Sequence, residues 1–402
     1  MKKHWLTLYE NTFLWLKKNT GLAYNAENKK QLVFPLYDKI EKICHHLLIK
    51  ENLYSIELSD EVINDNEVSQ WINSLVSIQA GYLTLNVEFE KRPVSLKPIL
   101  KVQDKKEHFV EQHNLGFKGE ILQYIHELTF YINGSEHGNN EYFKQSVFPV
   151  KKCRNLDSSK ILFFIKYCMN PFLSNINLVG NIFLYPDFER FISDITDLSI
   201  PCTIHITVQD FINSIAQLKT DNWPEHVNFN ILVNTVFDVA LIKDCTLPYT
   251  ITTFIFTEND YLEFSTLFDE IPNNHTIIYK PLYNKQNLRF FESSVFIDMD
   301  DLAAIDLSKN DIFMRQALNI IDFGKLTVMP DEKVYANVNE PPLGTINDST
   351  YSIVYKEFTE GKSWFKIRDQ SPCQDCMFQW LCPSPSNYET AIGQVNLCHV
   401  KQ

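Results

Sequence analysis

Residues Glu127-Leu128-Thr129-Phe130-Tyr131-Ile132-Asn133 form a short run rich in β-branched and aromatic residues. Such a run favours a buried β-strand. Similar runs recur along the middle of the chain, and together they predict six strands: 128–132, 176–179, 203–207, 227–233, 251–256 and 276–279. The middle of the chain therefore has the material for one substantial sheet.

Helical patterns lie between several of these runs, as at 160–169, behind the capping run Asp157-Ser158-Ser159, and at 187–195. Strand–helix alternation predicts an α/β protein with a parallel sheet, built either as an open partial barrel or as a doubly wound sheet. No strand is followed by GxGxxG and a helix, so the dinucleotide-binding version of the fold is not expected.

Composition excludes several classes of function. The 402 residues include 50 acidic and 37 basic side chains, a net charge of −13 that disfavours nucleic acid as a partner. Only 11 residues are glycine, which disfavours phosphate-cradling loops. The longest apolar runs are far too short to span a membrane, and Glu10 and Asn11 interrupt any leader-like stretch. We therefore expect a cytoplasmic protein with reduced thiols, without a membrane or nucleic-acid partner.

The segment before this α/β region, residues 1–115, predicts a small α+β module. Short β-prone runs at 13–16, 22–24 and 31–34 are separated by turn-prone residues. An amphipathic helix follows, with Tyr37, Ile40, Ile43, Cys44, Leu47 and Leu48 on one face. A further strand is expected at 54–58, and Asp60 is a candidate N-cap of the next helix. This pattern is compatible with a winged-helix-like module.

The chain after the α/β region, residues 321–402, has a different character. Two short β-prone runs, 326–328 and 333–335, flank Pro330-Asp331 and predict a hairpin, and 349–358 reads as a helix. These boundaries leave residues 116–320 for the α/β region.

The sharpest motif is Cys373-x2-Cys376-x5-Cys382-x15-Cys398, which places four of the nine cysteines within 26 residues. A C-x-x-C pair places two thiolates on one ion or cluster, and two further cysteines complete an all-sulfur site. Spacing alone leaves zinc and an iron–sulfur cluster open. No catalytic motif of the GxSxG, P-loop, HExxH or paired-carboxylate type appears.

The other five cysteines are scattered. Cys44 and Cys168 fall in apolar helical patterns and are expected in the core, and Cys202 and Cys245 belong to no motif. Cys153 stands among Lys151, Lys152 and Arg154, which could depress the pKa of its thiol, although an exposed thiol without function is the simpler interpretation.

The tail, Cys373-Gln-Asp-Cys376-Met-Phe-Gln-Trp-Leu-Cys382-Pro-Ser-Pro-Ser-Asn-Tyr-Glu389, resembles the SPASM domain of ribosomal-peptide maturases. In those proteins the SPASM domain follows a radical-SAM partial (β/α)6 barrel, and several begin with a small winged-helix peptide-recognition element. The resemblance therefore implies three parts: a recognition module at 1–115, a barrel at 116–320 and a SPASM-like domain at 321–402.

The radical-SAM motif itself is missing. The family implies C-x3-C-x2-C after the first barrel strand, where three thiolates hold a cluster that binds S-adenosylmethionine. This chain has Ser135, Asn139 and Tyr142 at those positions. The Gly-Gly-Glu-like turn expected after the second strand reads Val179-Gly180-Asn181-Ile182. The resemblance thus implies a degenerate barrel without catalytic residues, and S-adenosylmethionine is an unlikely ligand.

The SPASM-like part also departs from the family, which binds two auxiliary [4Fe–4S] clusters. Cys373, Cys376, Cys382 and Cys398 match one ligand set. Ser386 replaces a ligand of the other cluster, and Ala336-Asn337 lies where a hairpin cysteine is expected. One cluster is therefore expected.

This combination resembles the pseudo-radical-SAM proteins of GG-Bacteroidales peptide systems. That resemblance implies an inactive accessory protein, which binds a ribosomal precursor peptide, a true radical-SAM SPASM maturase, or both. A strand such as Phe13–Leu16 would offer a sheet edge to the peptide. The alternatives are a redox or electron-transfer subunit (or a peptide maturase) that uses the remaining cluster, and a structural zinc site.

Overall fold

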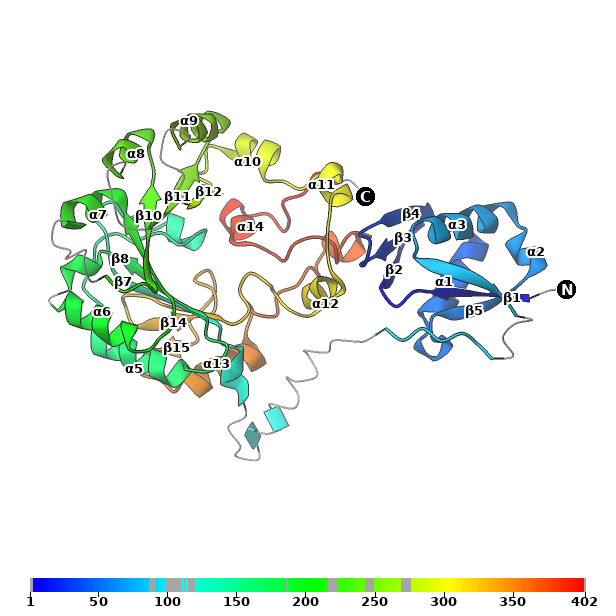
Figure 1. Cartoon of the computed structure of the whole chain (residues 1–402), viewed down its shortest axis with the longest axis horizontal. Coiled ribbons are helices and arrows are strands. Elements are labelled where there is room, and N and C mark those ends of the chain that lie inside the picture. Colours follow the sequence, from blue (N-terminus) through cyan, green and yellow to red (C-terminus); the bar gives the residue numbers. More distant parts are fainter. Residues whose placement is uncertain are drawn as a thin grey trace.

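A computed structural model of the chain describes residues 3–86, 91–97, 110–111, 113–114, 120–185, 187–215, 223–242, 249–268 and 276–400. Figure 1 shows a larger α/β body joined to a smaller N-terminal module. In the part of the chain so described, no helix has both the length and the apolar character needed to cross a membrane.

All six strands expected in the middle of the chain are present and parallel. They are β7 (Glu127–Gly134), β8 (Asn175–Gly180), β9 (Cys202–Thr207), β10 (Val227–Val233), β11 (Tyr249–Ile255) and β12 (Thr276–Pro281). Their order in the sheet follows their order in the chain. A doubly wound sheet reverses its strand order part-way, so that alternative is wrong.

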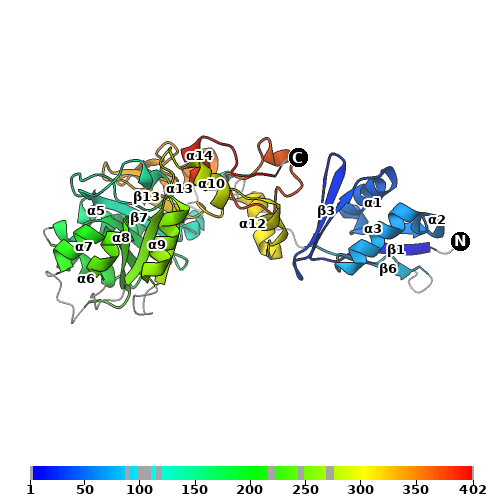
Figure 2. The same ribbon diagram turned by 90° about the horizontal axis from the view of Figure 1, so that it is seen from above.

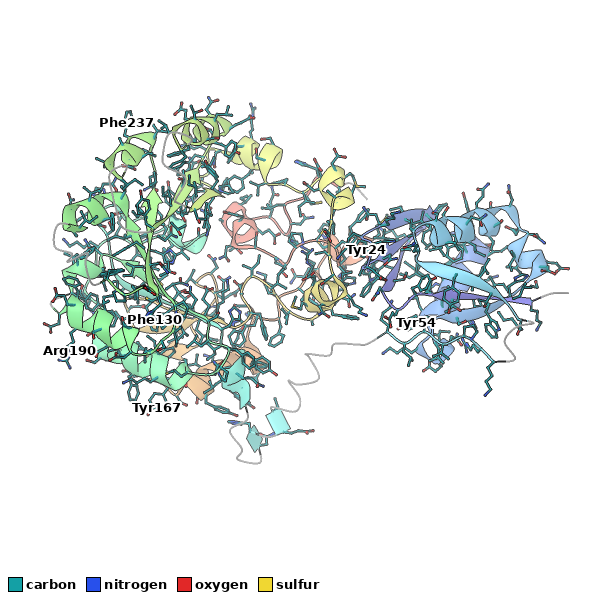
Figure 3. All side chains as sticks on the ribbon, in the orientation of Figure 1. Tyr24, Tyr54, Phe130, Tyr167, Arg190 and Phe237 are labelled. Carbon is teal, nitrogen blue, oxygen red and sulfur yellow. The ribbon has the colours of Figure 1, made fainter. Side chains whose placement is uncertain are left out.

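A helix follows each of the first five strands: α5 (Ser158–Cys168), α6 (Phe188–Thr196), α7 (Val208–Ile215), α8 (Val236–Ile242) and α9 (Glu258–Phe268). These helices lie along the outer side of the curved sheet (Figure 1). Asp157 caps α5, because its carboxylate accepts hydrogen bonds from the amides of Ser159 and Lys160. The apolar faces of helices and strands merge in the largest hydrophobic core, which contains Phe130, labelled in Figure 3.

The predicted hairpin extends the same sheet. Strand β13 (Lys325–Val328) runs parallel to β7 and pairs with β14 (Lys333–Tyr335), which pairs with β15 (Gly344–Thr345). The helices of this half are α10 (Leu288–Ser294), α11 (Met299–Ala303), α12 (Lys309–Ala317), α13 (Thr350–Glu360) and α14 (Asn387–Ile392). The α/β body as a whole also contains the short 3-10 turns η2 (Glu120–Tyr124), η3 (Tyr142–Lys144), η4 (Ile182–Leu184) and η6 (Cys373–Asp375).

The N-terminal module contains two three-stranded antiparallel sheets. The first is β2 (Thr12–Lys17), β3 (Thr20–Asn25) and β4 (Gln31–Pro35), which confirms the three expected strands. The second places β1 (Lys3–Leu8) between β5 (Ser55–Ser59) and β6 (Gly81–Leu85). The module also contains α1 (Asp38–Leu48), η1 (Lys50–Asn52), α2 (Asp60–Ile63) and α3 (Asn66–Ser77).

Two details of this module differ from expectation. Strands β1 and β6 were not predicted, because they pair with each other and not with their neighbours in sequence. Asp60 is the first residue of α2 and not its N-cap, and its carboxylate accepts a hydrogen bond from the ring of His4 at 3.1 Å.

The N-terminal module contacts the α/β body through a small hydrophobic cluster, which includes Phe13 and Phe313, and through hydrogen bonds of Tyr24. The Tyr24 hydroxyl donates to the carbonyl of Leu307 at 3.0 Å and accepts from its amide at 2.8 Å. The rings of Phe13 and Phe313 pack edge to face with centroids 5.3 Å apart. Figure 2 shows the module beside α12, and Figure 3 labels Tyr24 at this junction.

Candidate functional site

The structure brings all four motif cysteines to one cavity of about 320 Å³. Cys373 is the first residue of η6, and Cys376 is the C-cap residue that follows it. Cys382 lies in the loop that comes after, where backbone hydrogen bonds form tight turns. Cys398 comes from the C-terminal segment, which forms a parallel bridge with Ile297. The four thiols thus reach one space from two segments of the tail.

Local packing holds this loop in shape. The Cys376 amide donates to the Cys373 carbonyl at 3.0 Å, and the Cys382 amide donates to the Phe378 carbonyl at 3.0 Å. Phe378 and Leu381 are buried between the loop and the N-terminal module. Lys17 of that module donates hydrogen bonds to the Gln374 carbonyl and to the Gln379 side chain. Lys18, at the turn between β2 and β3, also lines the cavity.

One buried arginine lies beside the thiols. A guanidinium nitrogen of Arg368 lies 3.9 Å from Cys373 Sγ, and another donates to Glu389 at 2.7 Å inside the protein. Burial raises the pKa of Cys382 to about 12, Arg368 opposes that shift, and the three other thiols add to it. Guanidinium groups at this distance favour anionic sulfur ligands.

The four thiols are compatible with an iron–sulfur cluster as the bound group. Four thiolates on one zinc ion lie within ~3.8 Å of one another, given a Zn–S distance of about 2.3 Å. Among the residues that the structure describes, no three Cys, His, Asp or Glu side chains approach closely enough to share one ion. A four-iron cube has metal at each of four separated corners, so its thiolates surround a larger volume. Four cysteines around 320 Å³ suit that geometry.

The three residues at the radical-SAM motif positions do not form a ligand set. Ser135 is buried, and its hydroxyl accepts a hydrogen bond from the His137 amide at 3.0 Å. The Asn139 side chain accepts from the Glu141 amide at 2.8 Å. The Tyr142 ring packs between Phe148 and Phe256, with centroid distances of 5.5 and 5.9 Å.

Part of the chain packs against this loop, and a cavity of about 600 Å³, lined in part by Asn140, Phe143 and residues 150–154, also borders it. Residues 149–152 lie against it, and the Ser135 amide donates to the Val150 carbonyl at 2.9 Å. A Cβ atom on Gly138 would lie 1.9 Å from the Val150 carbonyl oxygen, which leaves no room for any side chain. The loop after β7 is therefore closed on its own backbone.

In the turn after β8, the backbone groups are hydrogen-bonded to a side chain of this same chain. Asn133, at the end of β7, donates its side-chain amide to the Asn181 carbonyl at 2.8 Å and accepts from the Asn181 amide at 2.9 Å. A Cβ atom on Gly180, which has φ of +132°, would lie 2.5 Å from the same Asn133 side chain. Both backbone groups of Asn181 thus have a partner in this chain.

The positions where the SPASM resemblance implies ligands of a second cluster hold a polar network. Ala336 is buried, and Asn337 donates to Asp322 at 2.9 Å and to Asn387 at 2.7 Å. Ser386 precedes α14 as its N-cap residue, without a side-chain capping bond.

The inner face of the sheet has a row of polar residues that the sequence analysis missed. His205 stands at its centre, with Nε2 3.0 Å from the Asn177 side-chain oxygen and Nδ1 3.0 Å from the Asn230 side-chain nitrogen. Because an amide oxygen only accepts, His205 must carry its proton on Nε2. Thr129 and Thr252 end the row at 3.2 and 3.0 Å. The sequence does contain a sign of this row: each of the successive strands β8, β9 and β10 has one polar residue at an inward-facing position, namely Asn177, His205 and Asn230.

The remaining cysteines give no reactive site. Cys44, Cys168 and Cys202 are buried, which confirms the core placement expected for the first two. The depressed pKa considered for Cys153 is wrong, because partial burial raises the pKa of this thiol, which donates to the Asn133 carbonyl. Cys245 lies outside the described residues.

In the β2–β3–β4 sheet of the N-terminal module, β2 and β4 are the edge strands. Strand β2, the expected peptide edge, is an edge strand, but Phe13 and Leu14 are buried and Lys97 donates a hydrogen bond to the Thr12 carbonyl. Strand β4 is more open, and Val33 is 47% exposed.

The register identifies the free groups on β4. The Asn25 amide donates to Lys30, and the Leu36 amide donates to Asn19. Because hydrogen-bonded pairs alternate along an antiparallel ladder, the backbone groups of Leu32 and Phe34 face β3. Those of Gln31, Val33 and Pro35 face outward, and Pro35 has no N–H to donate.

Comparison with known proteins gives structural likenesses only. The chain is similar to Streptococcus suis SuiB bound to the precursor peptide SuiA, with 11% identity, a TM-score of 0.48, and coverage of 100% of this chain and 99% of the other. It is also similar to Streptococcus suis SuiB bound to S-adenosylmethionine, with 12% identity, a TM-score of 0.47, and coverage of 96% and 97%. No family model and no curated protein matches the sequence.

Proposed function

We propose that the protein is a catalytically inactive, radical-SAM-like accessory protein of ribosomal-peptide maturation, of the pseudo-radical-SAM kind. It would bind a precursor peptide, the active radical-SAM SPASM maturase, or both, in the cytoplasm. The observation that supports this most directly is the contrast between two sites. Four motif cysteines surround one cavity in the tail, whereas the loop after β7 has Ser135, Asn139 and Tyr142 and is closed on itself.

The proposed organisation has three parts. Residues 1–115 form a winged-helix-like recognition module, 116–320 a degenerate partial (β/α)6 barrel, and 321–402 a SPASM-like domain. The sequential parallel strand order supports a barrel-like arrangement over a doubly wound one.

Cys373, Cys376, Cys382 and Cys398 would hold one [4Fe–4S] cluster, and Arg368 would balance part of its negative charge. The group would supply structural order to the tail and, when bound, one-electron redox capacity. Phe378 and Leu381 join the same loop to the N-terminal module, so an ordered loop also steadies that module.

Inactivity is supported by the contacts at both cosubstrate landmarks. Asn133 occupies the two backbone groups of Asn181 that a cosubstrate amino group would otherwise approach. We therefore expect no heat of binding when S-adenosylmethionine is titrated into the anaerobic protein.

The peptide would add as a strand to the free edge of β4. Outward groups of Gln31 and Val33 supply two donors and two acceptors, and the Pro35 carbonyl adds a third acceptor. Val33→Pro removes one outward N–H without touching the bonds to β3. Loss of one such bond costs about 1 kcal/mol, which weakens peptide affinity about fivefold.

The experiment is native mass spectrometry of the full chain with the short peptide and the maturase that its own operon encodes. Wild type and Val33→Thr, which keeps the N–H, should form a complex at micromolar concentration, and Val33→Pro should form much less. No complex with either partner at that concentration would contradict the proposal.

The alternative, a redox or electron-transfer subunit, has one supporting observation: Cys382 and Cys398 are only partly buried, so the cavity reaches the surface. Anaerobic reduction by dithionite separates the functions. Transfer of electrons to the maturase, without any effect on peptide binding, would favour this alternative. A colourless protein with one zinc would leave a structural role.

A further inference from the structure

A second cavity, of about 280 Å³, opens on the inner face of the sheet between β7, β12, β13 and the tail. It adjoins Asn337 and Asn387, where the polar network occupies the positions of the missing second cluster. Its size lies just below the range of ~300–1,000 Å³ that holds drug-sized ligands. It suits a group of a few heavy atoms.

Lys280 provides the unusual feature of this cavity. Along β12, Ile277 and Tyr279 pack toward the helical layer, and the Tyr279 ring lies 5.1 Å from that of Tyr261 in α9. Alternation along the strand therefore turns Lys280 to the inner face, where it lines the cavity. No described residue forms a hydrogen bond or ion pair with its ammonium group. Burial and the nearby Lys325 lower the pKa of Lys280, and the Glu127 carboxylate opposes this shift.

The other charges in the cavity are already matched. Lys325 lies 3.7 Å from the carboxylate of Glu127, and Asp322 accepts from Asn337 at 2.9 Å. Burial raises the pKa of Asp322, which weakens it further as a partner for Lys280. Lys280 is therefore the one lysine of this cavity without a direct ion pair to a described residue.

Two neutral donors also lack partners. The Ser146 hydroxyl is buried and makes no hydrogen bond within the described structure. Asn387 accepts from Asn337 and Asn339 through its side-chain oxygen, and its side-chain nitrogen donates to none of the described residues. Of the two donors only the Ser146 hydroxyl is buried, and a buried donor without a partner costs about 1–3 kcal/mol, so a ligand that accepts from it is stabilised.

We propose that this cavity binds a single organic carboxylate, held by Lys280 and by the free donors of Ser146 and Asn387. A monoanion fits better than a phosphate dianion, because the Glu127 carboxylate also lines the space and repels added negative charge. The carboxylate comes either from an acidic side chain of a bound peptide or from a free small acid. Only the peptide source rests on the function proposed above.

Calorimetry with the full chain tests this site using three probes: propionate, the peptide Ac-Ala-Glu-Ala-NH2, and inorganic phosphate. Wild type should bind at least one carboxylate in the millimolar range or tighter, and phosphate more weakly. Tighter binding of the peptide identifies a peptide source, and equal binding of propionate identifies a free acid. Ac-Ala-Gln-Ala-NH2 should not bind.

Variants locate the binding. Lys280→Met should weaken carboxylate binding at least tenfold, Ser146→Ala a few-fold, and Lys166→Met, an exposed lysine on α5, not at all. If Lys280→Met does not fold, acylation of wild-type Lys280 followed by mass spectrometry replaces it, and a carboxylate should protect this lysine. Absence of binding by both carboxylates, equal affinity in Lys280→Met, tighter binding of phosphate, or no protection would overturn the proposal. Val33→Pro should leave propionate binding intact, so failure here is distinct from failure of the β4 site.

Discussion

The polar row on the inner face predicts an acid-labile sheet, and His205→Gln is the perturbation that tests it. His205 is buried, and burial, with a smaller effect of Lys280, lowers its pKa to about 3 from an ordinary value near 6.5. The unfolded chain therefore binds a proton between pH 6.5 and 3 that the folded chain does not. The stability that the neutral ring contributes is full above pH 6.5 and is lost as pH falls toward 3.

The magnitude follows from these two values. At pH 5.0 the unfolded histidine is almost fully protonated, and the resulting loss of stability relative to pH 7.5 is about 2 kcal/mol. Glutamine can keep both hydrogen bonds, donating to Asn177 and accepting from Asn230, but it does not titrate. The variant should therefore lack this pH-dependent loss, whatever its stability at pH 7.5.

Hydrogen exchange of peptides from β8, β9 and β10 measures the opening of this part of the sheet. After correction for intrinsic rates, wild-type exchange should accelerate about thirtyfold between pH 7.5 and 5.0, and His205→Gln exchange less than threefold. All other ionisable groups are identical in the two proteins, so their contributions cancel in the comparison. Equal acceleration in both proteins would refute the reasoning.

Further changes have defined outcomes. Tyr24→Phe removes both hydrogen bonds to Leu307 and should weaken docking of the N-terminal module by about 1–2 kcal/mol, seen as faster limited proteolysis at the junction while the module itself stays folded. Gly138→Ala places a Cβ atom against the Val150 carbonyl and should lower the melting temperature by several degrees, whereas Glu141→Ala on the same loop should not. Burial raises the pKa of Glu357 to about 7, so wild type should lose stability as pH rises from 5 to 8, and Glu357→Gln should lose less, as measured by thermal melts.

Local patterns predicted most of the fold. The six central strands are short, β-branched and buried, and Asp157 caps α5 as its position before an apolar helix predicts. The order of the strands could not be predicted from sequence, because it depends on the edge of the sheet at which each strand is added after its crossover helix. Strands β1 and β6 were not predicted, because their pairing partners lie far away along the chain.

The candidate site also has residues that local sequence patterns predict and residues that only the folded structure reveals. Cysteine spacing predicted which four thiols belong together, since the motif is local apart from Cys398. Asn133, whose side chain bonds the backbone of Asn181, and Lys280, whose ammonium has no partner in the described structure, could not be found from sequence. Each acquires its role from residues on other strands.

The most direct test of the central claim is the metal and sulfide content of the full chain after anaerobic reconstitution. Wild type and Cys153→Ser should contain ~4 iron and ~4 sulfide per chain, with broad visible absorption, and Cys376→Ser should lose most of both. Cys153 serves as the matched control because it lies outside the cysteine cavity. One zinc per chain without iron, ~8 iron per chain, or an unchanged iron content in Cys376→Ser would contradict a single cluster held by Cys373, Cys376, Cys382 and Cys398.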